Sequence, residues 1–338
     1  MNALEIQIAE PYKAELREAH LPSPAPTEVL VRALYSGVSS GTELAVYTGI
    51  HQWLKDPDYP EWRFPFRAGY SAYGVVEAVG SEVSRVSPGD SVAYAGRHAA
   101  LGVYPEEAVW RDPHGASPAV AALGCVARYG WGAAARVGAV MGKSVFVMGL
   151  GAVGQFAARS FIAAGAYPVV GLDPFENRRK AALQGGASAA LDPTADGFEA
   201  QAAELLGEAR ADLVADATGS PQLTMKAAAL TKDGGKCVVV GSPRGLADGV
   251  NFYPDLHRRW IEMIGAHGDF LWSPTAAALG WNVDKAMDWI LAHMANGRLN
   301  TDGLPSRIAD PRDAQDVYEQ LLNRKGEAVC VSFDWSRV

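Results

Sequence analysis

A glycine-rich turn at residues 149–154 constrains the fold of this 338-residue chain more than any other feature. The turn reads Gly149-Leu150-Gly151-Ala152-Val153-Gly154, follows the apolar run 144–148 and precedes a run of helix formers. A tight turn between a buried strand and a helix is typical of a parallel sheet in which strands and helices alternate.

The spacing of the glycines in this turn favours a bound dinucleotide. Gly149 permits the tight turn, Gly151 lets the backbone approach a pyrophosphate, and Gly154 lets the helix pack on the strand. The positive N-terminus of the helix then faces the phosphates. The candidate cofactor-binding residues of the turn are therefore Gly149, Gly151, Ala152, Val153 and Gly154.

An acid stands about twenty residues beyond the turn, at the end of a second apolar run. This residue, Asp173, can accept hydrogen bonds from both ribose hydroxyls and repel a 2′-phosphate, so the sequence favours NAD(H) over NADP(H). Arg178 and Arg179 could instead reach such a phosphate, or form the solvated face of the next helix. We keep Arg178 in the candidate cofactor set, together with Thr218 beyond the predicted strand at 212–217.

Composition excludes several classes of partner. The net charge is −8, and no basic cluster is longer than Arg178-Arg179-Lys180. Both observations argue against nucleic acid or an anionic membrane as a binding partner. The three cysteines are widely spaced and form no CxxC motif, as in a reducing compartment. The first residues have neither a basic region nor an apolar region typical of a signal peptide, so we expect a cytoplasmic protein.

The pattern along the chain predicts an α/β protein with two domains. Residues 1–126 are β-rich, whereas residues 127–268 alternate strands with Ala-rich helices, which predicts a doubly wound parallel sheet. Residues 269–338 contain two helical patterns and a last strand at 328–333, and we assign them to the N-terminal domain. The nicotinamide is expected in a cleft between the domains. The predicted strands of the sheet are 145–150, 169–173, 189–192, 212–217, 236–241 and 261–266.

Five stretches give the chain a resemblance to a known superfamily. They are Ser36–Glu43, Gly69–Val76, Gly89–Val92, Gly124–Gly132 and the glycine turn. The chain resembles the medium-chain dehydrogenase/reductases, the superfamily of the zinc alcohol dehydrogenases. The resemblance implies a GroES-like catalytic domain, a Rossmann cofactor domain, and hydride transfer between nicotinamide and a secondary alcohol or carbonyl. It also implies a homodimer or homotetramer with residues 260–268 near the subunit interface.

The chain departs from that superfamily at the positions that bind catalytic zinc. These positions hold Ser39 or Ser40, Tyr70 and Cys125, and a neutral hydroxyl and a phenol are poor zinc ligands. We therefore predict no metal site. The turns around Thr42 and Tyr70 most resemble a zinc-independent branch that includes bacteriochlorophyllide a dehydrogenase and polyol or sugar dehydrogenase-like proteins.

Without zinc, hydroxyl and imidazole groups must handle the substrate proton. The resemblance places Thr42 where relatives carry a proton-relaying hydroxyl, and Tyr70 could either donate to the substrate oxygen or fill space. Glu43 could act as a base or serve as a structural acid. His98 or His51 could pass the proton to solvent, or either could be structural.

Arg128 and Tyr129 follow Cys125 where the chain of relatives passes beneath the nicotinamide. Arg128 could stabilise an oxyanion and Tyr129 could pack against the ring, or both could face solvent from the first turn of a helix. The aromatic residues between 47 and 66 could contact a sugar or planar substrate, or pack a domain interface.

The leading hypothesis is a zinc-independent, NAD-dependent dehydrogenase of a secondary alcohol, polyol or sugar-like. Two alternatives are a reductase of a large aromatic ketone or activated alkene, and a non-catalytic NAD(H)-binding sensor.

Overall fold

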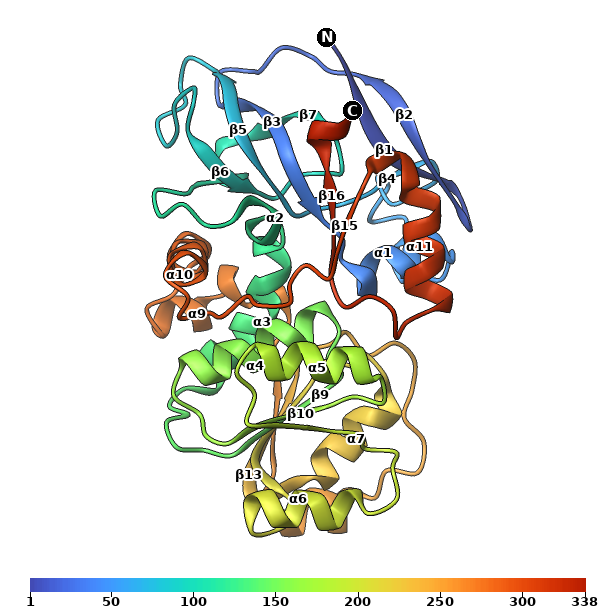
Figure 1. Ribbon diagram of the computed structural model, residues 1–338, viewed down its shortest axis with the longest axis vertical. Helices are drawn as coiled ribbons and strands as arrows, with labels where there is room; N and C mark the ends of the chain where they lie inside the picture. The colour runs from blue at the N-terminus through green and yellow to red at the C-terminus, as the bar shows by residue number, and fades with distance from the viewer. The chain divides into compact units, whose positions relative to one another are not determined.

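The computed structural model describes residues 1–338, and the chain divides into two compact units (Figure 1). The first unit contains residues 1–126, 287–297 and 304–338, and the second contains residues 127–286 and 298–303. No helix is both long enough and apolar enough to span a membrane.

The second unit is built on a six-stranded parallel sheet with the order β11-β10-β9-β12-β13-β14. The chain builds outward from β9 in one direction through β10 and β11, and then in the other through β12, β13 and β14. The change of direction between β9 and β12 creates the point where doubly wound sheets bind ligands. The strands are β9 (Val145–Met148), β10 (Val169–Leu172), β11 (Ala189–Leu191), β12 (Ala211–Asp216), β13 (Thr231–Val239) and β14 (Glu262–Gly265).

Helices cover both faces of this sheet because its central strands are apolar on both sides. Val145 and Val147 pack with α3 (Gly124–Val137) and α4 (Ala152–Ala163), while Phe146 packs with α6 (Phe198–Leu206) and α7 (Pro221–Ala229) on the other face (Figure 1). The side chains of a strand alternate between the two faces, so one run of apolar residues supplies two cores. The unit also contains α5 (Glu176–Gln184), α8 (Phe252–Asp255), the short helix η4 (Gly268–Trp272) and α9 (Pro274–Ala278).

The first unit contains a seven-stranded sheet and a three-stranded sheet. The larger follows the order β15-β16-β3-β5-β6-β8, with β7 also paired to β3, and the smaller is β2-β1-β4. The strands are β1 (Asn2–Glu10), β2 (Lys13–His20), β3 (Glu28–Gly37), β4 (Phe66–Arg67), β5 (Ala72–Val79), β6 (Ser91–Tyr94), β7 (Leu101–Pro105), β8 (Val109–Arg111), β15 (Arg307–Ala309) and β16 (Val331–Asp334).

Three helices accompany these strands: α1 (Ser40–Tyr47), α2 (Pro118–Ala121) and α11 (Ala314–Asn323). The helix α10 (Val283–Ala295) belongs to this unit from Met287 onward. The last strand, β16, pairs antiparallel with β3 and so returns to the N-terminal part of the chain. The larger core of this unit joins β1, α1 and α11 through Ile6, Val46 and Tyr318.

The predicted α/β class, with a β-rich domain and a doubly wound parallel sheet, is confirmed. The division of the C-terminal part differs from the expected one, because residues 269–286 and 298–303 belong to the second unit. The physical reason is packing on α3 and α4. Trp281 meets Trp131 edge to face at 4.7 Å, and the carbonyls of Asn300 and Asp302 accept hydrogen bonds from Arg159.

Candidate cofactor site and candidate catalytic site

The glycine turn has the geometry that its sequence predicts. Gly149 has a φ of +82°, a conformation that favours glycine. A Cβ on Gly154 would lie 1.8 Å from the carbonyl oxygen of Gly149, so any other residue would push the helix away from the strand. The turn is therefore tight because two different glycines meet two different steric demands.

The N-terminus of α4 is suited to a phosphate group. Gly151 is its N-cap residue, and no side chain caps the helix. A Cβ on Gly151 would meet no atom within 4 Å, which leaves open space in front of the first residues, Ala152 and Val153. Unpaired N–H groups and the helix dipole favour an anion there. These residues fit the pyrophosphate of a dinucleotide.

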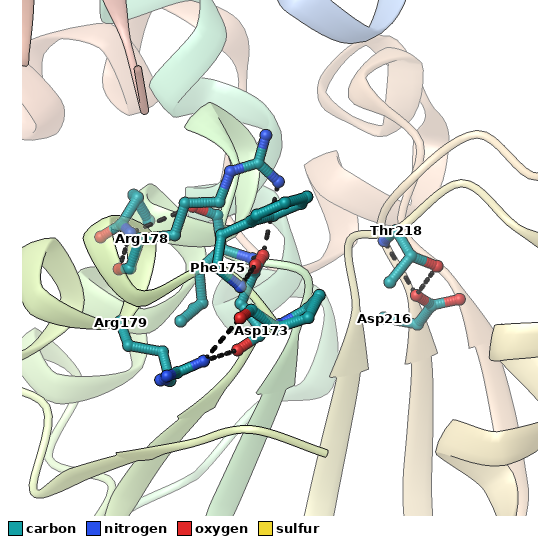
Figure 2. A network of polar contacts seen from close by, with 9 residues as sticks. Asp173, Phe175, Arg178, Arg179, Asp216 and Thr218 are labelled. Atoms are coloured by element: carbon teal, nitrogen blue, oxygen red, sulfur yellow. Dashed lines mark hydrogen bonds and ion pairs between the residues drawn. The ribbon is translucent and has the colours of Figure 1, made fainter. Parts of the chain in front are cut away.

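Thr218 lies beside the turn at the carboxyl end of β12. Its hydroxyl donates to Asp216 over 2.6 Å, and its backbone N–H donates to the same oxygen over 2.9 Å (Figure 2). A Cβ on Gly149 would lie 2.9 Å from the methyl group of Thr218. Thr218 and the glycine turn thus face each other across the point where the sheet changes direction.

Asp173 follows β10, and its carboxylate is 2 % exposed. One oxygen accepts from the N–H of Leu150 over 2.8 Å and the other accepts from the N–H of Phe175 over 2.9 Å. Arg178 donates to it over 3.4 Å, the longest of these contacts (Figure 2). The carboxylate therefore fastens the glycine turn to the end of β10, a structural role that sequence reasoning missed. A ribose hydroxyl would have to compete with Arg178 for it.

The two arginines of this region have different roles. Arg179 donates to the carbonyl oxygens of Asp173 and Pro174 over 2.7 and 2.8 Å, so it supports the turn. The guanidinium of Arg178 lies 5.1 Å from the ring centroid of Phe175, and its buried Nε has no hydrogen-bond partner (Figure 2). Of the two arginines, Arg178 is thus the one that has a donor without a partner beside Asp173.

In the first unit, a hydroxyl pair occupies two of the positions that the resemblance assigns to zinc ligands. Ser39 Oγ and the Tyr70 phenolic oxygen are 2.6 Å apart. Ser71, next to Tyr70, donates to the carbonyl of Ala122 over 2.6 Å and accepts from the N–H of Cys125 over 3.1 Å. The fold thus ties the three segments that carry Ser39, Tyr70 and Cys125 to one another.

These residues do not fit a catalytic zinc ion. Zinc takes deprotonated thiolates, imidazoles and carboxylates, and Ser39 and Tyr70 present hydroxyls that are hydrogen-bonded to each other. No group of three or more His, Cys, Asp or Glu side chains is arranged to hold a metal. Cys125 is the single ordinary zinc ligand of the three.

Glu43 lies in the first turn of α1 at the centre of a buried polar network. Its carboxylate accepts from the N–H of Ser39 over 2.7 Å, from His98 Nε2 over 2.9 Å and from the hydroxyl of Tyr318 over 2.5 Å. Burial and the charge of Glu43 hold the pKa of Tyr318 well above its usual value. This geometry favours the structural role of Glu43 over the role of a base, because three donors already use its oxygens.

The structure does not support the predicted role of His98 in passing a proton to solvent. Its side chain is 0 % exposed, and its Nδ1 lies 2.7 Å from Ser36 Oγ, which accepts from the indole of Trp335 over 2.8 Å. A Cβ on Gly69, which has a φ of +91°, would lie 2.6 Å from the backbone nitrogen of His98. The chain is packed tightly around the imidazole, so His98 cannot pass a proton directly to solvent.

His51 belongs to an aromatic cluster in the loop between α1 and β4. Its ring stacks on Trp62 at 4.4 Å, and its Nδ1 accepts from the N–H of Trp53 over 3.3 Å. Trp53 stacks on Tyr59 at 4.4 Å. These aromatic faces pack on one another. Thr42 lies in the first turn of α1 and is partly exposed. The proton-relay roles of Thr42 and His51 stay predictions.

In α3, Arg128 is buried and Tyr129 is partly buried. Arg128 is 6 % exposed and lies 4.6 Å from the ring centroid of Trp272. The ring of Tyr129 packs on Gly268 and meets His267 edge to face at 6.1 Å. The sequence offered no signal for the pairing with η4, because those residues are more than a hundred positions away.

Comparison with known proteins gives two family matches. The model of the alcohol dehydrogenase GroES-like domain matches residues 25–148, and the model of the zinc-binding dehydrogenases matches residues 152–274. The chain is 25% identical to the L-threonine 3-dehydrogenase of Thermococcus kodakarensis over 322 residues, covering 85% of this chain and 89% of the relative. It is 22% identical to the D-guloside 3-dehydrogenase of Escherichia coli over 318 residues, covering 89% and 90%.

Solved structures share the fold over nearly the whole chain. An Escherichia coli oxidoreductase/dehydrogenase of unknown specificity has a TM-score of 0.84 at 21% identity, covering 99% of both chains. A Sinorhizobium meliloti zinc-binding dehydrogenase bound to NADP has a TM-score of 0.79 at 20% identity, covering 99% of both. An E. coli alcohol dehydrogenase complexed with NADH has a TM-score of 0.81 at 16% identity, covering 98% of this chain and 99% of that one. The relatives that match this chain are oxidoreductases that act on CH–OH groups. The chain belongs to the medium-chain dehydrogenase/reductase superfamily.

Proposed function

We propose that this protein is a zinc-independent, NAD-dependent dehydrogenase of secondary alcohols of the polyol or sugar type. The observation that carries the proposal is the hydrogen-bonded pair Ser39–Tyr70, at two of the positions that the resemblance assigns to zinc ligands. A pair of hydroxyls can position and polarise a substrate oxygen, and it cannot replace the ligands of a Lewis acid.

Oxidation of an alcohol removes a hydride from carbon and a proton from oxygen. Nicotinamide, when bound, supplies the acceptor for the hydride. Residues of the first unit accept and transfer the proton. Tyr70 contacts the reacting oxygen, and Thr42 relays its proton, with His51 as the remaining imidazole candidate. Glu43 and His98 act as positioning residues, because Glu43 accepts from the N–H of Ser39 at the start of α1 and His98 holds the carboxylate of Glu43.

The preference for NAD(H) rests on Asp173. A carboxylate beside the adenosine ribose accepts from its hydroxyls and repels a 2′-phosphate. The Asp173 side chain lies at the end of β10 with Arg178 as its weakest contact, so a ribose hydroxyl displaces one long ion pair and leaves the bonds to Leu150 and Phe175 intact. Titration with NADH and NADPH tests this preference, and tighter binding of NADPH would assign Arg178 to the phosphate.

The polyol or sugar assignment is supported by the D-guloside 3-dehydrogenase relative, whose name describes oxidation of a sugar derivative. This name favours a hydroxyl-rich small-molecule substrate over a large aromatic ketone.

One assay separates the proposed activity from its rivals. Purified protein is incubated with NAD and a panel of polyols and sugars, and with NADH and a panel of aromatic ketones and enones. We expect oxidation of at least one polyol, unchanged after exhaustive chelation, and zinc far below one ion per chain by elemental analysis. Reduction of enones alone would assign the reductase function, and NADH binding with no turnover would assign the sensor. Stoichiometric zinc in active protein would overturn the zinc-independent mechanism.

A further inference from the structure

The second unit contains two buried arginines that differ completely in their partners. Arg159 is 1 % exposed and donates to the carbonyl oxygens of Gln155, Ala181, Asn300 and Asp302. Arg128 is 6 % exposed, and its buried Nε and Nη1 have no hydrogen-bond partner. The fold therefore satisfies one buried guanidinium fully and leaves the other with unused donors.

Aromatic rings hold the guanidinium of Arg128. It lies 4.6 Å from the ring centroid of Trp272 and 5.9 Å from that of Tyr129. Tyr129 is itself fixed, because a Cβ on Gly268 would lie 2.2 Å from its ring. Cation–π contacts offset part of the cost of burying the charge, and they leave the N–H groups in the guanidinium plane unused.

Arg128 lies on the side of the sheet where ligands bind. A Cβ on Gly130 in the same helix would lie 2.4 Å from the backbone nitrogen of Ala157, so this part of α3 packs directly on the first turns of α4. The helix α4 begins at the glycine turn, and η4 follows the carboxyl end of β14. The helix α4, on which α3 packs, and η4, against which the Arg128 side chain lies, thus both start from the carboxyl ends of parallel strands, where doubly wound sheets bind their ligands.

A buried charge without a hydrogen-bonding partner is costly, and an anion removes that cost best. The planar N–H groups of arginine match the oxygens of carboxylates and phosphates. We propose that Arg128 recognises a carboxylate or phosphate group of the substrate, so that the alcohol oxidised here is an anionic one. This inference rests on the proposed dehydrogenase function and adds the charge class of its substrate.

Binding to the intact protein saturated with NADH tests the inference, because the cofactor then fills the pyrophosphate site. Isothermal titration compares D-sorbitol, D-sorbitol 6-phosphate, D-gluconate and inorganic phosphate. We expect at least one of the anions to bind about tenfold or more tightly than sorbitol, on the scale of a hydrogen bond to a charged group. Arg128→Gln should abolish that preference and Arg128→Lys should retain part of it.

Arg136→Gln is the matched control, because Arg136 lies on the same helix with its guanidinium 5.8 Å from the ring of Phe270. It should keep the preference for anions. Arg128→Met supplies a second readout: without ligand it should unfold at the same or a higher temperature than the wild type, because it removes a buried charge whose cost the aromatic rings offset only in part. A large loss of thermal stability would identify Arg128 as structural and overturn the inference.

The remaining outcomes are equally decisive. Wild-type protein that binds none of the anions better than Arg128→Gln does would overturn the inference. A weaker affinity of Arg128→Gln for NADH itself, with the anion preference unchanged, would assign the guanidinium to the cofactor. Anion binding that depends on Arg128 in a protein that oxidises no alcohol would sink the proposed function and leave the anion site standing. Oxidation of neutral polyols without any preference for anions would support the proposed function and overturn the anion site.

Discussion

Two buried carboxylates, Glu43 and Asp173, each hold backbone N–H groups as well as side chains. Glu43 accepts from the N–H of Ser39, and Asp173 accepts from the N–H of Leu150 and Phe175. Backbone donors held by a charged acceptor fix the chain more firmly than neutral pairs do. At the scale of single residues, these acids therefore shape the two candidate sites.

Replacement of Tyr70 by Phe tests the hydroxyl pair. The ring packing remains while the donor at 2.6 Å from Ser39 is lost. If Tyr70 contacts the reacting oxygen, kcat should fall about a hundredfold or more, the effect of removing an oxyanion donor. Steady-state kinetics checks this, with Ser39→Ala as the control that breaks the same pair and keeps the phenol. An unchanged kcat in Tyr70→Phe would leave the ring as a space filler.

Replacement of Glu43 by Gln tests its structural role. The amide has one carbonyl oxygen where three donors now approach two carboxylate oxygens, so at least one buried donor loses its partner. The free energy of unfolding should fall by about 1–3 kcal/mol. Urea denaturation measures it. Loss of activity at unchanged stability would contradict this reading and return Glu43 to the role of a base.

At the scale of elements, the strand β13 carries a thiol in the apolar core on one face of the parallel sheet. Cys237 in β13 packs with Phe146 and Val214, and its thiol lies 4.0 Å from the carbonyl of Thr224. Burial, with a smaller contribution from the charge of Asp216, raises the pKa of this thiol from 9.0 to about 12. The strand therefore carries a group that stays protonated in the folded state.

This raised pKa predicts an alkaline loss of stability. Between pH 9 and 12 the unfolded chain releases the proton of Cys237 while the folded chain keeps it, so stability falls as pH rises. Below pH 9 both states keep the proton, and Cys237 contributes no pH dependence. The free energy of unfolding of Cys237→Ala should therefore decline less steeply than that of the wild type above pH 9. Equal slopes would show that the thiol ionises in the folded state. Tyr104, whose pKa burial raises to about 12, leaves a remaining slope in both proteins.

At the scale of the whole molecule, we propose a homodimer or homotetramer. The strand β14 ends the parallel sheet and is largely exposed, with Met263 40% exposed and the adjacent Trp260 74% exposed. An apolar strand with an unpaired edge is a site for pairing with another chain.

Light scattering coupled to size exclusion tests this assembly at micromolar concentration. We expect the mass of a dimer or tetramer, and Met263→Lys should shift it toward the monomer because a charge on the edge strand opposes pairing. Arg210→Glu, a charge change on an exposed side chain outside β14, is the control. A monomeric wild type would refute the proposal.

Much of the fold follows from local patterns. The glycine turn, the alternation of strands and helices, and the apolar runs depend on residues close in sequence, and they predicted the central strands of the parallel sheet. The placement of residues 269–286 did not follow, because it is decided by the packing of Trp281 on Trp131. The short strands β4 and β7 did not follow from local patterns either, because they are stabilised by pairing with distant strands.

The sequence by itself determined the dinucleotide turn and the absence of ordinary ligands at two inherited zinc positions, since both depend only on which residues are present. The tertiary structure alone decided the roles of the polar side chains. His98 is fully buried and contacts Glu43 and Ser36, while Arg128 is buried against Trp272 with no hydrogen-bond partner for its Nε and Nη1. Burial and hydrogen bonding depend on residues that are far apart in the chain. They decide whether a charged group is fully hydrogen-bonded within the fold or keeps donors that a ligand can bind.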